Sequence, residues 1–338
     1  MKGIGKIKKS GLPQRKVSDL MGIDFSTTAT KVVRLKKEKN KISLLGMRVF
    51  PPVDMNFPPR RQEFSKILST HYACLAYTAP SSVVRMVNAV LPEEEESLPD
   101  EKLRELLNVD SSFRVSANLL KRGAGRKESN LLAAAIPQND VRFFLNMFPA
   151  GPPAPASLEV SGLSFLSAFL HARGAQSAGE ALCLLELGES VSYFIFMNKG
   201  VVLLVGKFAV GGALLREKVA KDLGVDEELA DTILSDQSIN ISATLQGVMS
   251  PFLKQLSISK DFIERHQGCR ISKAYVSGGC ALIPHLSTVL GQELQSEVVL
   301  WNPLEKIRYE RGAIPKTLAG QGSRFAAAIG AAIGGLLQ

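Results

Sequence analysis

Short apolar strands separated by polar turns occur twice in this chain of 338 residues. The first set is predicted over residues 20–25, 30–35 and 42–50, and the second over 183–187, 191–197 and 201–210. Aligned on their first strands, the two sets place Ile23-Asp24-Phe25-Ser26-Thr27-Thr28 over Leu185-Glu186-Leu187-Gly188-Glu189-Ser190, an offset of 162 residues. Such an offset is far longer than a solenoid period. It therefore predicts two similar lobes, each built on an antiparallel meander.

The rest of the chain predicts further helices and strands around the two meanders. Helices are expected at 61–69, 100–107, 139–147, 161–171, 214–223, 284–294 and 322–337, and strands at 81–91, 131–136 and 271–276. The proline-rich residues 149–155 predict a linker. The pattern as a whole indicates an α/β protein of several structural units.

The net charge of +9 is concentrated at one end of the chain. Of the 41 basic and 32 acidic residues, 12 and 3 fall within residues 1–42, which leaves 29 of each for the rest. A near-neutral body does not predict a nucleic-acid interface. Residues 1–19 are expected to form a basic, flexible, solubilising tail, with weak contact to an anionic membrane as the alternative.

Cysteine spacing and hydropathy exclude several classes of protein. The four cysteines, Cys74, Cys183, Cys269 and Cys280, form no CxxC pair or cysteine–histidine cluster, so a zinc site is not expected. Neither a membrane-spanning run nor a secretion signal is evident. The expected location is the cytoplasm.

The first turn of each meander carries residues that could bind a ligand. Asp24 and Glu186 each end a strand and are followed by one apolar residue and then small or hydroxyl residues. Small residues let backbone amides approach phosphate oxygens, and a carboxylate at a strand end can hold Mg²⁺ through water. Either turn alone is better explained as an ordinary hairpin whose polar residues face solvent. Their duplication favours a clamp for a polyphosphate.

Two glycine-containing segments add to this prediction. Residues 271–276 lead into Ser277-Gly278-Gly279, and Gly211-Gly212 precedes a helix. A strand followed by glycines and a helix allows a flat ligand or a phosphate to approach the backbone. A P-loop and a strand-linked GxGxxG motif are both missing from the sequence.

This order of motifs resembles the actin, Hsp70 and sugar-kinase superfamily and, within it, the PilM branch, which is related to FtsA. The resemblance covers nearly everything from Leu20 to Leu337 and rests on residues 21–33, 82–92, 184–190, 211–230, 275–279, 301–303 and 325–330. It implies a bilobal actin/Hsp70-like, ribonuclease H-like fold with duplicated lobes and a PilM/FtsA-type extra subdomain. The subdomains it implies are 1A (20–79, completed by 157–181 and 323–338), 1C (80–156), 2A (182–212 and 271–322) and 2B (213–270).

The same resemblance implies a nucleotide site. ATP or ADP with Mg²⁺ is expected to contact Ser26, Thr27, Thr28, Lys31, Gly188, Glu189, Ser190, Gly211, Gly212, Lys218, Ser277, Gly278, Gly279 and Cys280, with Asp24 and Glu186 as metal or water-positioning carboxylates. Glu159 is a further candidate for orienting a water, with a solvent-facing role as the alternative. The family usually has Gly at Ser26, Asp at Glu186 and Gly at Cys280, so binding without efficient hydrolysis is expected.

The function implied is a cytoplasmic ATP-binding scaffold, peripheral at the inner membrane, of a type IV pilus, or related secretion, inner-membrane assembly complex. Its implied partners are the cytoplasmic tail of a PilN-like membrane protein, docked on the first lobe, and other pilus assembly proteins. The alternative is an active ATPase or phosphotransferase on the same fold, because a fold does not fix a function. The catalytic base and substrate pocket that such an enzyme requires are not evident in the sequence.

Overall fold

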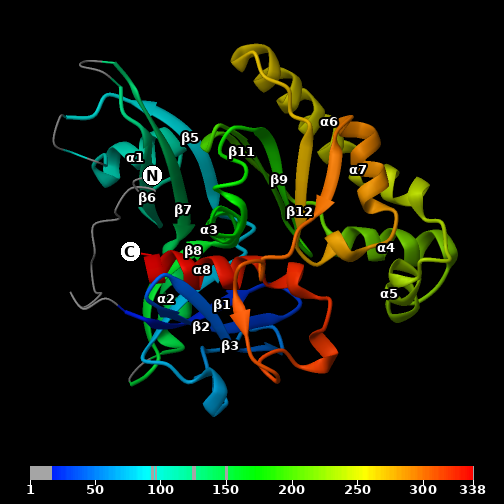
Figure 1. Cartoon of the computed structure of the whole chain (residues 1–338), viewed down its shortest axis with the longest axis horizontal. Helices are drawn as coiled ribbons and strands as arrows, with labels where there is room; N and C mark the ends of the chain where they lie inside the picture. Colours follow the sequence, from blue (N-terminus) through cyan, green and yellow to red (C-terminus); the bar gives the residue numbers. More distant parts are fainter. Residues whose placement is uncertain (1–16, 93–94, 96, 124–126, 149–150, 338) are drawn as a thin grey trace.

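The computed structural model describes residues 17–92, 95, 97–123, 127–148 and 151–337, and its strands form three sheets (Figure 1). A six-stranded sheet has the order β14-β3-β2-β1-β4-β8, a five-stranded sheet β11-β10-β9-β12-β13, and a three-stranded sheet β5-β7-β6. Of the basic tail predicted at 1–19, residues 1–16 lie outside the described residues, as does part of the acidic run at 93–96.

The two larger sheets repeat one another strand by strand. In the first lobe, β1 (Asp19–Phe25) pairs antiparallel with β2 (Thr30–Glu38), which pairs with β3 (Lys41–Phe50), and on its other side β1 pairs in parallel with β4 (Tyr72–Tyr77). In the second lobe, β9 (Ala181–Leu187), β10 (Ser192–Asn198), β11 (Val201–Phe208) and β12 (Lys273–Ser277) follow the same order. Both bounds of β1 and β9 differ by 162 residues, which confirms the predicted duplication.

Two helices lie side by side between the large sheets (Figure 1). Helix α3 (Ser161–Arg173) contacts β9 and β10, whereas α8 (Ala326–Leu337) lies against β1, β2 and β4. Their glycines are required by close packing. A Cβ atom on Gly330 would lie 1.8 Å from the carbonyl oxygen of Ser164, and one on Gly22 of β1 would lie 2.0 Å from that of Ala328. The small residues of 322–337 thus let α8 pack closely against β1 and α3.

A small subdomain inserted in the first lobe has its own core. It comprises β5 (Val83–Ala89), α1 (Asp100–Leu107), β6 (Phe113–Lys121), β7 (Ser129–Pro137) and α2 (Gln138–Asn146). Its core includes Val87, Leu103 and Leu131. The helix predicted at 100–107 has these bounds in the structure. We call this unit subdomain 1C.

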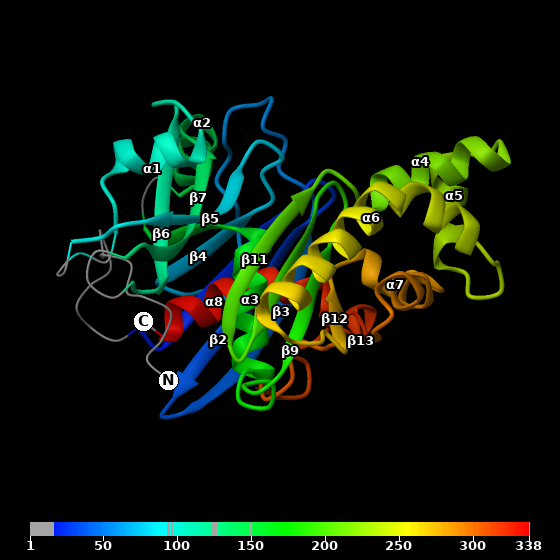
Figure 2. The same ribbon diagram turned by 90° about the horizontal axis from the view of Figure 1, so that it is seen from above.

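Helices dominate the outer part of the second lobe. Helices α4 (Gly212–Leu223), α5 (Glu227–Ser235) and the first part of α6 (Ser242–Gln267) project at the opposite end of the molecule from α1 and α2 (Figure 2). Helix α7 (Leu286–Leu294) and β13 (Glu297–Leu300) complete the lobe. The chain then returns to the first lobe, where β14 (Arg308–Tyr309) pairs with β3.

Two sequence predictions are wrong in part. Residues 61–69 form no α-helix but only a 3₁₀ turn at Lys66–Leu68, because Leu68 is the single buried residue of that segment and cannot anchor a helix. The predicted linker at 149–155 gives way at Ala154 to an edge strand, β8 (Ala154–Val160). No helix in the described part of the chain is both long and apolar enough to cross a membrane.

Candidate functional site between the two strand-end turns

Asp24 is the last residue but one of β1 and is almost fully buried. Its Oδ2 atom lies 2.9 Å from Lys31 Nζ, and its Oδ1 atom accepts a hydrogen bond of 2.8 Å from Ser161 Oγ at the start of α3. Lys31 is in reach because it is the register partner of Asp24 across the β1–β2 hairpin. The buried charge of Asp24 is therefore paired and hydrogen-bonded within the first lobe.

The turn after Asp24 is held by Ser26. Its backbone N–H and its hydroxyl both donate to the carbonyl oxygen of Ala29, and its hydroxyl accepts a bond of 3.1 Å from Lys31 Nζ. Thr27 and Thr28 are exposed at the tip of the turn. The first turn thus presents one ammonium group and two exposed hydroxyl residues.

Glu186 takes the equivalent position in the second lobe but has different neighbours. Its register partners are Tyr193 on β10 and Ser277 on β12. The pKa of Glu186 is raised to about 8, mainly by burial and also by the negative charge of Asp24, while Lys31 opposes the rise. The start of α3 joins the two turns. Its Ser161 bonds Asp24, and a Cβ atom on the next residue, Gly162, would lie 2.2 Å from the ring of Tyr193, the register partner of Glu186.

Three glycines around the second turn leave no room for a side chain. A Cβ atom added to Gly188 would lie 2.4 Å from the carbonyl oxygen of Val191. One added to Gly211 would lie 2.3 Å from the carbonyl oxygen of Gly188, and one added to Gly278 would lie 2.2 Å from that of Leu187. Gly278 also has a positive φ of 94°. The structure therefore brings together the second turn, the start of α4 and the Ser277–Cys280 segment.

Direct hydrogen bonds join these three segments. The backbone N–H of Gly212 donates to the carbonyl oxygen of Gly188, and that of Ala213 donates to Glu189. The thiol of Cys280 also donates to the Gly188 carbonyl. Cys280 is buried, and burial raises the pKa of its thiol to about 12, so it serves as a packed, protonated group here.

Glu189 and Lys218 have partners outside the turns. The Glu189 carboxylate lies 2.6 Å from Arg216 of α4, which also binds Asp231 of α5. A Cβ atom on Gly212 would lie 2.6 Å from Glu189 Oε2, so this carboxylate covers the start of α4. Lys218 is exposed and pairs with Asp222 one turn along the helix. The side chain of Glu189 is thus held by Arg216, while its carbonyl oxygen accepts the bond from Ala213 at the second turn.

Several serine hydroxyl groups in the segments around Glu186 are buried. The side-chain oxygens of Ser190, Ser277 and Ser323 are buried and have no hydrogen-bond partner among the residues that the structure describes. Ser277 is next to Glu186 on the sheet, and the Ser323 carbonyl accepts from the Gly278 N–H. Buried polar groups normally have partners, so a bound ligand or water fits this place.

Glu159 is two strands away from Asp24 in the first sheet, because Asp24 pairs with Ala76 and Ala76 with Glu159. It sits on β8, where its carboxylate accepts bonds from Ser164 Oγ at 2.9 Å and Ser157 Oγ at 3.4 Å. Burial raises its pKa to about 7. A Cβ atom on Gly334 of α8 would lie 3.7 Å from Glu159 Oε1. This carboxylate is therefore packed between the first sheet and helices α3 and α8.

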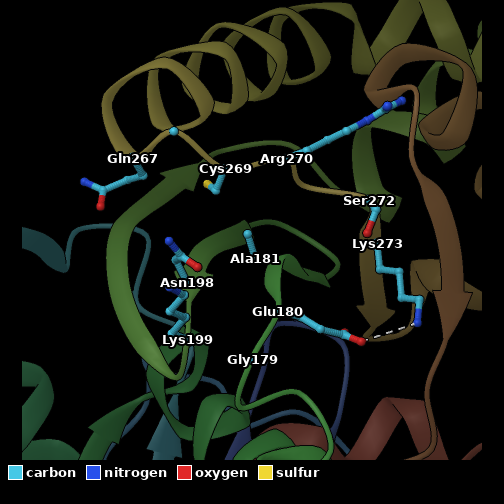
Figure 3. A pocket seen from close by; sticks show the side chains of 11 residues that line it. Gly179, Glu180, Ala181, Asn198, Lys199, Gln267, Cys269, Arg270, Ser272 and Lys273 are labelled. Carbon is cyan, nitrogen blue, oxygen red and sulfur yellow. Dashed lines mark ion pairs between the residues drawn. The ribbon is translucent and has the colours of Figure 1, made fainter.

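A cavity of about 370 Å³ lies at the other end of the second sheet, where β9 begins rather than where it ends (Figure 3). Its lining includes Glu180, Lys199 and Lys273, and none of the predicted site residues. Glu180 pairs with Lys273 at 3.8 Å, while Arg270 extends away from them. The described part of the chain contains no cluster of three or more His, Cys, Asp or Glu side chains that could hold a metal ion.

The structure adds three residues that the sequence did not single out. Ser161 reaches Asp24 from a helix that starts 137 residues later, Arg216 holds Glu189, and Tyr193 faces Glu186. Only Tyr193 had a usable signal, since the 162-residue offset aligns it with Lys31. The other two depend on tertiary contacts.

Comparison with known proteins agrees with this fold. The model of the type IV pilus assembly protein PilM family matches residues 164–335. A solved PilM–PilN type IV pilus biogenesis complex is similar with a TM-score of 0.77 and 16% identity, over 95% of this chain and 99% of that chain. The ethanolamine utilization protein EutJ from Carboxydothermus hydrogenoformans has a TM-score of 0.46 and 14% identity, over 96% and 92%.

MreB 5 of Spiroplasma citri, bound to AMPPNP, has a TM-score of 0.44 and 10% identity over 94% of this chain and 95% of that chain. No curated protein matches the sequence. The similarity to the PilM–PilN complex covers nearly the whole of both chains. It shows that the fold is bilobal and actin-like, as predicted. The family model matches more than half of the residues of this chain. This chain therefore belongs to the type IV pilus assembly protein PilM family.

Proposed function

We propose that this protein binds ATP or ADP with Mg²⁺ between its two strand-end turns and acts as a cytoplasmic scaffold at the inner membrane for type IV pilus, or related secretion, assembly. The observation that carries the nucleotide proposal is the placement of Asp24 and Glu186 at equivalent ends of two duplicated strands, which the start of α3 joins. The glycine packing around Gly188 and the unpartnered hydroxyls of Ser190 and Ser277 support it.

Each side of the site would supply a different set of groups. From the first turn, Lys31, Ser26, Thr27 and Thr28 would hold phosphate oxygens. From the second lobe, Gly188, the backbone of Glu189 and Ser190 would complete the clamp, and Gly211, Gly212, Ser277, Gly278, Gly279 and Cys280 would border the nucleoside, with Lys218 at the outer rim. Asp24 and Glu186 would hold Mg²⁺ through water, and the ion would neutralise phosphate charge.

A binding role fits these residues better than rapid turnover. Asp24 is already engaged by Lys31 and Ser161, and Glu186 sits where its raised pKa favours the neutral form at pH 7. Glu159, the other candidate for activating water, is engaged by Ser157 and Ser164. The alternative, an ATPase or phosphotransferase, requires a base near the phosphates. Fast hydrolysis by the purified protein would favour that alternative.

The proposed partner is the cytoplasmic tail of a PilN-like membrane protein, bound on the first lobe, with other pilus assembly proteins around it. Support comes from the family membership and from the similar fold of the PilM chain in a PilM–PilN complex. An extended peptide held by strand pairing and side-chain pockets would suit such a tail. This binding would bring the protein to the membrane.

Calorimetry tests the nucleotide proposal directly. Titration of the full chain with MgATP and MgADP should give micromolar affinity, about 8 kcal/mol. Repeating the titration with EDTA should weaken binding, because the two carboxylates contribute through Mg²⁺. Absence of binding at high protein concentration would end the nucleotide proposal and leave the pilus-scaffold proposal to be tested by partner capture.

The basic tail allows a separate test of membrane contact. Residues 1–19 carry six basic side chains and Asp19. Each basic residue near an anionic surface contributes about 1 kcal/mol, so ~5 kcal/mol is an upper limit and salt weakens it. Deleting residues 1–16 should reduce co-sedimentation with anionic vesicles and leave pull-down of the partner peptide intact. Loss of peptide capture in lipid-free buffer would contradict this separation.

A further inference from the structure

Lys207, near the end of β11, is bound by four oxygen atoms of the first lobe. Its Nζ atom donates to the carbonyl oxygens of Ala79 and Pro80 at 2.7 Å, to that of Ser82 at 2.6 Å, and to Ser82 Oγ at 3.1 Å. No acidic side chain in the described residues forms a salt bridge with it. Burial lowers the pKa of Lys207 to about 8, as expected for an ammonium group without a carboxylate partner.

The loop that Lys207 binds is the entrance to subdomain 1C. Residues 79–82 connect β4 of the first lobe to β5 of subdomain 1C. Strand β5 also runs beside β11 (Figure 2). The loop therefore belongs by sequence to the first lobe, while its strongest polar contact is with the second.

Subdomain 1C has a different kind of attachment to the first lobe. Phe144 of α2 is buried between Phe25 and Tyr77, with ring centroids 4.6 Å and 4.5 Å apart. Such an apolar contact cannot open without exposing a large buried surface. An ammonium group that leaves its carbonyl oxygens can be rehydrated, and lysine is strongly hydrated. Of these two attachments, the one at Lys207 is the easier to release.

Lys207 also lies in one row with the residues of the nucleotide site. Across the second sheet, Ser277 pairs with Glu186, Glu186 with Tyr193, and Tyr193 with Lys207. Laterally paired residues project from the same face of a sheet. At the end of this row, Lys207 binds the hydroxyl of Ser82. The site and the loop are therefore joined by contiguous polar side chains.

We propose that Lys207 is a releasable latch that fastens the entrance of subdomain 1C to the second lobe. With the latch closed, subdomain 1C bridges both lobes and holds the angle between them. With the latch open, subdomain 1C stays on the first lobe through Phe144 while the lobes separate. The latch belongs to the protein without ligand and does not depend on the proposed function.

Hydrogen–deuterium exchange of the ligand-free full chain tests the latch. Lys207→Met keeps the side-chain stem and removes the ammonium group. We expect exchange at Thr78, Ser82 and β5 to become at least about tenfold faster, since these amides report local opening, while β1 is unchanged. Electron-spin distance measurements between labels on the two lobes should show a broader distribution. Lys254→Met, an exposed lysine of α6, is the matched control and should change neither readout.

Ser82→Ala provides a milder second variant if Lys207→Met folds poorly. It removes one of four acceptors and leaves the three carbonyl oxygens, so a smaller increase confined to the same amides is expected. Unchanged exchange at residues 78–89 in Lys207→Met would overturn the proposal. So would an equal increase in β1, because that would show a general loss of stability rather than the release of one contact.

Discussion

Asp24 and Glu186 stand at equivalent ends of β1 and β9, and each faces its register partner on the next strand, Lys31 in the first lobe and Tyr193 in the second. Asp24 pairs with an ammonium group and accepts a bond from Ser161. Glu186 has a phenol and a serine beside it, and its pKa is raised to about 8. One backbone arrangement, used twice, thus supports two different states of charge.

This difference implies a division of roles between the turns. The first turn carries a carboxylate whose charge is balanced inside the protein. The second turn carries a carboxyl group that favours its neutral form at pH 7 and would ionise when a cation arrives, because a bound metal ion stabilises the charged form. The duplicated fold therefore provides one permanent and one conditional charge at the same site.

The largest expected effect comes from removing Lys31, the counter-ion of Asp24. Lys31→Met leaves Asp24 buried without its counter-ion, and such losses typically cost about 3–5 kcal/mol. Tyr193→Phe, the equivalent change in the second lobe, removes a hydroxyl without a hydrogen-bond partner in the described residues and should cost about 1 kcal/mol or less. Urea unfolding at pH 7 measures both. Equal losses would show that the two turns do not differ electrostatically.

Nucleotide binding should show the same asymmetry with a smaller effect. Asp24→Asn should weaken MgATP binding about a hundredfold, or ~2.7 kcal/mol, and ATP binding in EDTA much less. Glu186→Gln should weaken MgATP binding less than tenfold at pH 7, because Glu186 is already largely neutral in the free protein. Titration calorimetry of both variants provides the comparison. A greater loss for Glu186→Gln would reverse the assignment of permanent and conditional charges.

The pH dependence of stability should separate the turns further. The pKa of Glu186 is raised from its ordinary value of 4.5 to about 8, so the folded protein keeps a proton that the unfolded chain loses. Stability contributed by the neutral group is complete below pH 4.5 and is lost as the pH rises to 8.

Glu186→Gln cannot lose that proton, so its stability relative to wild type should increase by about 1–2 kcal/mol between pH 5 and 8, after allowance for partial exposure. Unfolding midpoints measured across this range provide the test. Asp24→Asn is the control at the equivalent position in the first lobe. Parallel profiles for wild type and Glu186→Gln would show that Glu186 is ionised throughout.

The sequence predicted the duplicated strands well because their signal is local. Short apolar runs joined by charged hairpins located β1, β2, β9 and β10, and the offset aligned Asp24 with Glu186. Strand β4 was missed, because Tyr72–Tyr77 is a short buried run without alternation. The linker predicted at 149–155 because of its prolines includes the first two residues of β8, although Pro155 is compatible with an edge strand.

The side-chain contacts of the site could not be predicted, because they join residues that are far apart in the sequence. The sequence placed Lys31 and Glu189 at the nucleotide, but nothing local indicates that Ser161 reaches Asp24 or that Arg216 holds Glu189. Helix α6, with Pro251 in its interior, was not predicted, and its packing on the second lobe overrides that residue's helix-breaking tendency. Residue types were thus readable from the sequence, whereas their partners required the fold.

The smallest expected effect concerns turnover, where the two carboxylates differ by one methylene. Glu186→Asp shortens the conditional side chain to the length of Asp24, and misplacement of about 1 Å can cost a hundredfold in rate. We therefore expect it to raise slow ATP hydrolysis by roughly tenfold, equivalent to ~1.4 kcal/mol. Asp24→Glu, the converse change, should disturb the bonds to Lys31 and Ser161 and give no increase. Phosphate release assays on purified protein decide between them, since a fast wild-type rate abolished by Glu186→Asp would mean that Glu186 is the better-placed catalytic group and that the protein is an active ATPase.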